Sequence, residues 1–261
     1  MKMHRIIAIM LRHWYNFIHS PDRLTDAFFW PSLDMVLWGL TILALTTRGM
    51  GSNLWIASVV FGAVLWYFVW RGQSEMTIGL LEELWSENLI NIFASPLKFG
   101  EWVIGLCGVA IVKIGLTTLL EALLVFLLYQ VNFFGLGWYL VPFALILTLM
   151  SWAFGFFVTG MILRYGTNIQ TLAWSGIYIL SPLSAVYYPL SILPEWLHYI
   201  SGMLPSTYVF EAMRLIVSGG TLSPEWMVKP LILNLIYLAL GLWFITRSFA
   251  VARNKGLGHL Q

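Results

Sequence analysis

Charged residues are scarce in this chain. Asp, Glu, Lys and Arg make up 10% of its 261 residues, whereas soluble domains carry about 25%. Water is therefore not the main solvent of this protein. The formal net charge is +2 and the basic residues are scattered along the chain, so the sequence has no basic stripe of the kind that binds nucleic acid.

Motifs for common membrane-enzyme chemistry are also missing. The sequence has no Gly-x-x-x-x-Gly-Lys-Ser/Thr phosphate loop and no His-Glu-x-x-His, so we expect neither ATP hydrolysis by that route nor a zinc protease. All five histidines fall outside the predicted membrane spans, which argues against an intramembrane serine protease. Ser175 and Gly176 are then a small-residue packing pair. We expect no enzyme activity in this chain.

The sequence also lacks a second cysteine and a cleavable leader. Cys107 is the only cysteine, so an intrachain disulfide is excluded, and its apolar surroundings indicate a buried structural thiol. No short apolar core followed by a small-residue cleavage site opens the chain. We expect the first membrane span to direct the protein to the membrane.

Apolar residues, in contrast, make up 59% of the chain, and the mean hydropathy is +0.81. A run of about 20 apolar residues is long enough to cross the hydrocarbon core as a helix. The sequence thus predicts an all-α polytopic membrane protein, a single domain over 1–261, with six spans. They are expected at 28–46, 54–70, 102–129, 138–163, 171–188 and 230–249.

The distribution of Lys and Arg predicts the orientation. Ten of these residues fall on the side of the amino terminus, whereas Arg48, Arg214 and Lys229 fall on the other. Because cytoplasmic loops are rich in Lys and Arg, this split places both termini in the cytoplasm. We expect a multi-pass protein of the cytoplasmic (inner) membrane.

The first of three unusual segments between spans is residues 4–19. At 100° per residue, its apolar side chains share one arc and Arg5, Arg12, Asn16 and His19 share the opposite arc. We predict an interfacial helix whose basic face meets water and anionic headgroups; the alternative is a frayed tail. The apolar arc comprises Ile6, Ile7, Met10, Leu11, Trp14, Phe17 and Ile18.

The second segment is residues 74–96, which Ser95 and Pro96 end. It reads as a separate cytoplasmic helix with an apolar and an acidic side. An acidic helix opposes the positive charge of this side of the membrane, so we predict contact with another protein; the alternative is a solvated charged face. The apolar side comprises Leu80, Leu81, Leu84, Trp85, Leu89 and Ile92, and the acidic side comprises Glu82, Glu83 and Glu87.

The third segment, residues 181–205, is apolar but contains four prolines. Each proline removes a backbone donor and clashes with the preceding helical turn, so a continuous helix is excluded. We predict short broken helices that dip into the outer leaflet. The prolines are Pro182, Pro189, Pro194 and Pro205.

Three charged residues fall inside the predicted spans: Asp34, Lys113 and Glu121. An unpaired charge at the bilayer centre costs at least about 2.5 kcal/mol, so each should face the bundle, a partner or water. Lys113, Thr117 and Glu121 lie on one stripe of a helix. Asp34 and Lys113 fall at similar depth, which allows an interhelical ion pair that fixes packing; a substrate or proton site is the alternative.

The order of these parts resembles the type-2 family of ATP-binding cassette permeases. The most specific stretch runs from Tyr188-Pro189 through Leu193-Pro194 to Glu211-x-x-Arg214. It is similar to the family signature before the last helix, with Leu-Pro-Ser-Thr at 204–207 where the family has an Asn-Pro-x-Thr-like turn.

The resemblance implies roles for two segments. Residues 79–93 would be the coupling helix that seats in an ATPase subunit, and residues 189–214 would be re-entrant helices closing the outer mouth. The implied coupling residues are Leu81, Glu82, Glu83, Leu84, Trp85 and Glu87, and the implied gate residues are Pro189, Pro194, Pro205 and Tyr208. For Leu84 and Trp85, an aromatic flanked by leucines also fits the pattern of an interface hot spot.

The resemblance further implies an exporter that uses ATP hydrolysed elsewhere. The expected partners are a cassette ATPase, which would hold the ATP and Mg²⁺, a second permease copy contacting the first and fifth spans, and membrane lipids. This chain itself would bind no cofactor and no metal. The alternative is a non-conducting scaffold or assembly subunit of the same fold. Trp30, Trp38, Tyr178 and Tyr187 would stack on a sugar or a hydrophobic drug, or anchor the chain at the interface.

Overall fold

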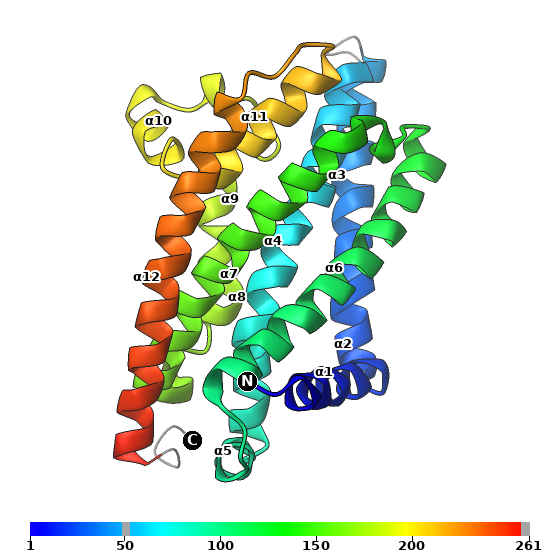
Figure 1. The fold of residues 1–261 in the computed structure, drawn as a ribbon. Coiled ribbons are helices and arrows are strands. Elements are labelled where there is room, and N and C mark those ends of the chain that lie inside the picture. The colour runs from blue at the N-terminus through cyan, green and yellow to red at the C-terminus, as the bar shows by residue number, and fades with distance from the viewer. Residues whose placement is uncertain (49–52, 257–261) are drawn as a thin grey trace.

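A computed structural model describes residues 1–48 and 53–256, and every regular element within these ranges is a helix (Figure 1). Five helical stretches are long and apolar enough to cross a membrane, so the protein is membrane-embedded. These stretches are Pro21–Thr47, Leu54–Trp85, Phe99–Tyr129, Phe133–Ile169 and Glu225–Lys255.

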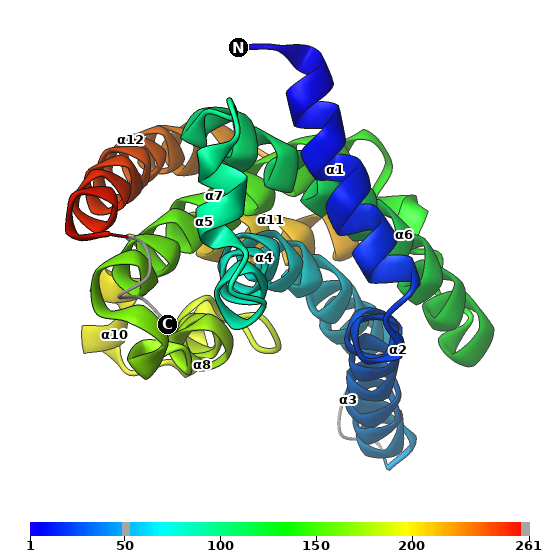
Figure 2. The same cartoon turned by 90° about the horizontal axis from the view of Figure 1, so that it is seen from below.

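Helix α1 (Met3–Ile18) crosses the end of the bundle beside α6 (Phe99–Tyr129) (Figure 2). A methyl group on Gly105 of α6 would meet Ile9 at 2.6 Å, so the two helices are in close contact. The segment is thus a helix and not a frayed tail. The side packed on the protein comprises Ile6, Ile9, His13 and Phe17.

The predicted apolar arc of α1 is wrong in one respect. Ile7, Leu11 and Ile18 are exposed on α1, so apolar residues cover two sides of the helix, one against α6 and one outward. The basic side of α1 also does not face only water and headgroups, because two of its arginines contact glutamates of the protein. Arg5 lies 3.6 Å from the Glu101 carboxylate and Arg12 lies 2.8 Å from that of Glu83.

A continuous helical stretch follows α1. It consists of α2 (Pro21–Leu24), a π-helical turn η1 (Thr25–Phe29) and α3 (Trp30–Thr47). Only a small part of this stretch is covered by the rest of the chain. The first crossing therefore runs along the outside of the bundle (Figure 1).

Helix α4 (Asn53–Trp85) is the central element, and most of it is buried. It is one helix of 33 residues, so the prediction of a separate cytoplasmic helix over 79–93 is wrong. No proline interrupts residues 71–85, and neighbouring helices bury the polar residues there, so the helix continues past the apolar run. A turn with Glu87 at φ 53° separates α4 from the short helix α5 (Leu89–Ala94).

The third, fourth and last predicted spans agree with α6, α7 (Leu140–Tyr165) and α12 (Glu225–Lys255) to within a few residues at most ends. A 3-10 turn, η2 (Phe133–Tyr139), precedes α7. Small residues bring α7 and α12 together, since a methyl group on Gly241 would meet the Ala153 carbonyl at 2.8 Å. Asn234 of α12 also donates a hydrogen bond of 2.8 Å to the Ile146 carbonyl.

The predicted span over 171–188 is not a continuous helix. After η3 (Gly166–Ile169), the chain forms α8 (Leu172–Tyr178) and α9 (Leu180–Leu183). This apolar stretch is shorter than the length needed to cross about 30 Å, and Ala185 at φ 54° ends it. The predicted count of six spans is therefore not confirmed.

The proline-rich segment forms short helices, as predicted. They are η4 (Leu190–Ile192), α10 (Glu195–Ser201) and α11 (Pro205–Val217). Pro189 and Pro194 precede η4 and α10, and Pro205 is the first residue of α11, a position where the missing N–H has no helical partner. These helices lie at the end of the bundle opposite α1 and α5 (Figure 1).

Candidate functional site

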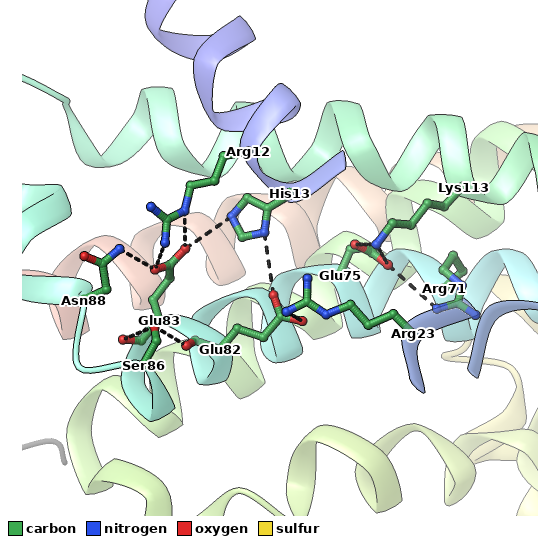
Figure 3. Close-up of polar contacts among 10 residues, drawn as sticks. All are labelled: Arg12, His13, Arg23, Arg71, Glu75, Glu82, Glu83, Ser86, Asn88 and Lys113. Carbon is green, nitrogen blue, oxygen red and sulfur yellow. Dashed lines mark hydrogen bonds and ion pairs between the residues drawn. The ribbon is translucent and has the colours of Figure 1, made fainter. Parts of the chain in front are cut away.

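The end of α4 carries an ion-pair network that joins it to α1 (Figure 3). Arg12 donates two hydrogen bonds to the Glu83 carboxylate, of 3.0 and 2.8 Å, and Asn88 donates a third of 3.2 Å. Glu83 is 1% exposed. A bidentate guanidinium–carboxylate pair is strong and directional, so it fixes the angle between the two helices.

A second ion pair joins the end of α4 to α2. Arg23 lies 2.8 Å from the Glu82 carboxylate. His13 stands between the two glutamates, with one ring nitrogen 3.8 Å from Glu82 and the other 3.7 Å from Glu83 (Figure 3). The last turns of α4 thus move together with α1 and α2.

A second cluster of ion pairs lies deeper in the bundle, around Glu75 of α4. Lys113 of α6 donates to both Glu75 oxygens, at 2.9 and 2.7 Å, and Arg71 lies 3.7 Å from the same carboxylate (Figure 3). Arg71 also donates to the Asp26 side chain at 2.9 Å and to the Asp26 carbonyl at 3.1 Å. Four segments, η1, α4, α6 and the neighbouring α1, therefore meet around paired charges.

The predicted ion pair between Asp34 and Lys113 is wrong. Lys113 pairs with Glu75, and Asp34 instead accepts a hydrogen bond of 2.8 Å from the Tyr67 hydroxyl. The prediction failed because the second span was ended at Trp70, which left Glu75 outside the membrane. A lysine side chain reaches several ångströms along the bundle, so equal depth of two backbone positions does not decide its partner.

The predicted coupling residues divide into buried and exposed groups. Leu81 and Leu84 are buried in the chain's own core, so neither side chain is free to contact an ATPase subunit. Trp85 and Glu87 are exposed. Trp85 stacks on Trp174 at 6.1 Å and donates to the Gln170 side chain at 3.1 Å, which attaches α4 to the segment around α8.

Asp34 faces a cavity of about 200 Å³ between α3, α4 and the segment that contains α8 and α9. Aromatic rings form most of its wall. Trp38 stacks on Tyr187 with a centroid distance of 4.7 Å, and the rings of Trp70 and Tyr178 are tilted, with centroids 5.0 Å apart. The lining residues are Asp34, Trp38, Trp66, Tyr67, Trp70, Tyr178, Ser181 and Tyr187. Trp30, which the sequence grouped with these aromatics, is exposed and does not line it.

Glu121, like Asp34, forms no ion pair with a described residue. It is fully buried, and both its carboxylate oxygens lack a hydrogen bond within residues 1–48 and 53–256. Asp34 and Arg71 are close enough to interact with it electrostatically. Lys113, Thr117 and Glu121 are all buried on α6, as their spacing predicted.

The opposite end of the bundle is held by a clamp on α11. Glu211 accepts from the Leu190 amide and from Arg214, both at 2.8 Å. Arg214 also donates to the carbonyls of Ala185 and Val186. Burial lowers the pKa of the Arg214 guanidinium, and the Glu211 carboxylate opposes that shift. The Glu-x-x-Arg motif thus fixes the turn that precedes Pro189.

Tyr208, one of the implied gate residues, belongs to the same region. Its hydroxyl donates to the Gly202 carbonyl at 2.8 Å, and Lys229 lies 5.0 Å from its ring centroid. It therefore fastens α11 to the end of α10 and to α12.

Sequence reasoning missed Arg71, Glu75 and the cavity tyrosine Tyr67. Their spacing was a usable signal, since residues 67, 71 and 75 are i, i+4 and i+8 and lie on one stripe of α4. Within the described part of the chain, no group of His, Cys, Asp and Glu is arranged to hold a metal ion. Neither a protein-family model nor a curated protein matches this chain.

Proposed function

We propose that this chain is the permease subunit of an ATP-driven exporter that works with a separate ATPase. The observation that carries the proposal is the network of ion pairs. Ion pairs join the exposed tip, formed by the end of α4 and by α5, to α1 and α2, and a second cluster joins α4 to η1 and α6 deeper in the bundle. An external push on this tip would be transmitted to several membrane helices at once.

The direction of transmission follows from the contacts. Arg12 and Arg23 tie α1 and α2 to the end of α4. Since α2 continues through η1 into α3, a displacement of the tip tilts α3. Helix α3 carries Asp34 and Trp38, which form one wall of the cavity. Binding of a partner at the tip would therefore change the width of the cavity.

The expected second copy would cover the outer face of α3 and of the segment at 171–188. Both carry large exposed apolar side chains, among them Leu37 and Leu40 on one side and Tyr178 and Ile179 on the other. The cavity lies between these two elements. A dimer formed there would place the two cavities near its interface, where a path for substrate is expected.

The exposed tip is where an ATPase subunit would bind. Trp85 and Ile90 are about half exposed and Glu87 is exposed beside them. A large aromatic with an aliphatic neighbour is typical of the few residues that supply most of the energy of an interface. Glu87, which has no ion-pair partner within the described residues, would guide a basic patch of the ATPase.

The test compares tagged variants purified from native membranes in mild detergent. The measurements are vanadate-sensitive ATP hydrolysis in the purified complex and its response to added solutes. Trp85→Ala is expected to reduce associated hydrolysis at least about tenfold, because a hot-spot truncation costs about 2 kcal/mol or more. Trp138→Ala, at a more exposed tryptophan before α7 (69% against 51% for Trp85), is the control and should retain it.

Melting temperatures of both variants exclude misfolding as the cause. Retention of wild-type hydrolysis by folded Trp85→Ala would overturn the assignment of the tip. An ATPase that binds the tip but responds to no solute would favour the non-conducting scaffold. The isolated chain should not bind ATP, because the sequence has no phosphate loop.

A further inference from the structure

The aromatic cavity has an excess of negative charge around it. Arg71 and Lys113 are the cations in this part of the described bundle, and both are engaged by Asp26 and Glu75. Among the described residues, neither Asp34 nor Glu121 forms an ion pair, although Arg71 interacts with Glu121 electrostatically. Glu121 is fully buried and Asp34 is partly buried. A carboxylate removed from water without a counter-charge is costly, so the site favours the entry of a positive charge.

Besides this negative charge, the aromatic walls of the cavity also favour a cation. Tryptophan and tyrosine rings present a negative face, and a cation within about 6 Å of the ring centroid is attracted to it. Trp38, Trp66 and Trp70 line the cavity together with three tyrosines. Aromatic rings around one carboxylate are the arrangement that recognises alkylated ammonium groups.

We propose that this cavity binds an alkylammonium group, with Asp34 as counter-ion and the tryptophans as walls. The proposal deepens the proposed function, on which it rests, by giving the substrate or bound lipid a chemical class. Asp34 would contact the cation directly, and Tyr67 would hold the Asp34 carboxylate in place through its 2.8 Å hydrogen bond.

A sugar is the competing ligand, since sugars also stack on aromatic rings. Its recognition needs several donors and acceptors that match its hydroxyl groups. Here the Tyr67 hydroxyl is already committed to Asp34, which leaves the hydroxyls of Tyr178, Ser181 and Tyr187 and the indole N–H groups for a sugar. Sugar binding would also leave the negative charge of Asp34 uncompensated. The charge therefore favours a cation over a neutral sugar.

The test uses ligand-observed saturation-transfer NMR on the full chain in phosphatidylglycerol nanodiscs, with empty nanodiscs as the blank. The probes are choline, its neutral isostere 3,3-dimethylbutanol, and glucose. Choline is expected to bind saturably and at least about tenfold more tightly than the isostere, because the two differ in charge and not in shape.

Two variants locate the site. Asp34→Asn keeps the acceptor for Tyr67 and removes the charge, and it should weaken choline binding about tenfold. Trp38→Leu should weaken it several-fold, whereas Trp30→Leu, an exposed tryptophan on the same helix, should not change it. Melting temperatures equal to wild type show that each variant is folded.

A further probe distinguishes two sources of the ammonium group. Glycerophosphocholine carries the same cation next to a phosphate. Tighter binding of this probe than of choline points to a lipid headgroup, and weaker binding points to a free organic cation; both support the ammonium site. Equal binding of choline and the isostere, preference for glucose, no saturable choline binding, or unchanged affinity in Asp34→Asn would overturn it.

The binding test does not use the ATPase, so the two proposals fail separately. A chain that associates with an ATPase through Trp85 but does not bind choline would remain a permease without this site. A chain that binds choline but has no associated ATPase would retain the site and lose the exporter assignment.

Discussion

Two groups of acidic side chains in this protein have opposite surroundings. In the network at the end of α4, Glu75, Glu82 and Glu83 each lie within 3 Å of an arginine or lysine nitrogen. In the cavity, the Tyr67 hydroxyl is the only hydrogen-bond partner of Asp34 within residues 1–48 and 53–256. In the first group each carboxylate is neutralised by a basic side chain of the same chain. In the second, no basic side chain among the described residues pairs with Asp34. The comparison separates acids that hold helices together from Asp34, the acid that we propose binds a ligand.

The largest effect is expected from Glu75→Gln. Among the described residues, it removes the only carboxylate paired with Lys113 and one of the two that form ion pairs with Arg71. Removing one partner of a buried ion pair costs about 3–5 kcal/mol. The melting temperature and folded yield in detergent should fall sharply.

The double variant Glu75→Gln/Lys113→Gln is the control for this prediction. It removes both charges, so it should recover much of the lost stability. Additive losses in the two single variants and the double variant would show that Lys113 has another main partner.

A smaller effect is expected at the next pair along α4. Glu83→Gln replaces the carboxylate that accepts from Arg12 and Asn88, which should cost about 1–3 kcal/mol. Glu87→Gln on the following turn is exposed and should change stability by less than about 0.5 kcal/mol. Equal melting temperatures for the two variants would mean that the pair with Arg12 does not hold α1.

The smallest effect is expected at Asp34. Asn in its place still accepts from Tyr67 and carries no buried charge, so Asp34→Asn should change the unfolding free energy by less than about 1 kcal/mol in either direction. The measurement is the melting temperature without ligand. A loss as large as that of Glu75→Gln would make Asp34 a structural residue and remove the contrast between the two regions.

Much of the fold was predictable because the apolar, amphipathic or proline-rich pattern of one segment indicates the structure of that segment. The long apolar runs predicted the regions of α3, α6, α7 and α12, and the amphipathic pattern predicted α1. The prolines predicted the short helices after α9. The stripe of Lys113, Thr117 and Glu121 followed from helical geometry alone.

The candidate site was only partly predictable. Asp34, Lys113 and Glu121 were recognised as charges that need partners, and Trp38, Tyr178 and Tyr187 as aromatics of interest. The partner of Lys113 was not recognised, because hydropathy ended the second span before Glu75. Tyr67 and Trp70 read as part of an apolar run, although they face Asp34 across helices.

By itself the sequence determined that the chain is helical and membrane-embedded, and where prolines break its helices, because length, hydropathy and backbone chemistry are local properties. Tertiary structure decided that α4 continues to Trp85 and that Leu84 is buried. It also decided that Lys113 pairs with Glu75 and that Asp34 lines a cavity. These outcomes depend on which side chains other helices bring within about 3 Å, and the pattern along one segment does not contain that information.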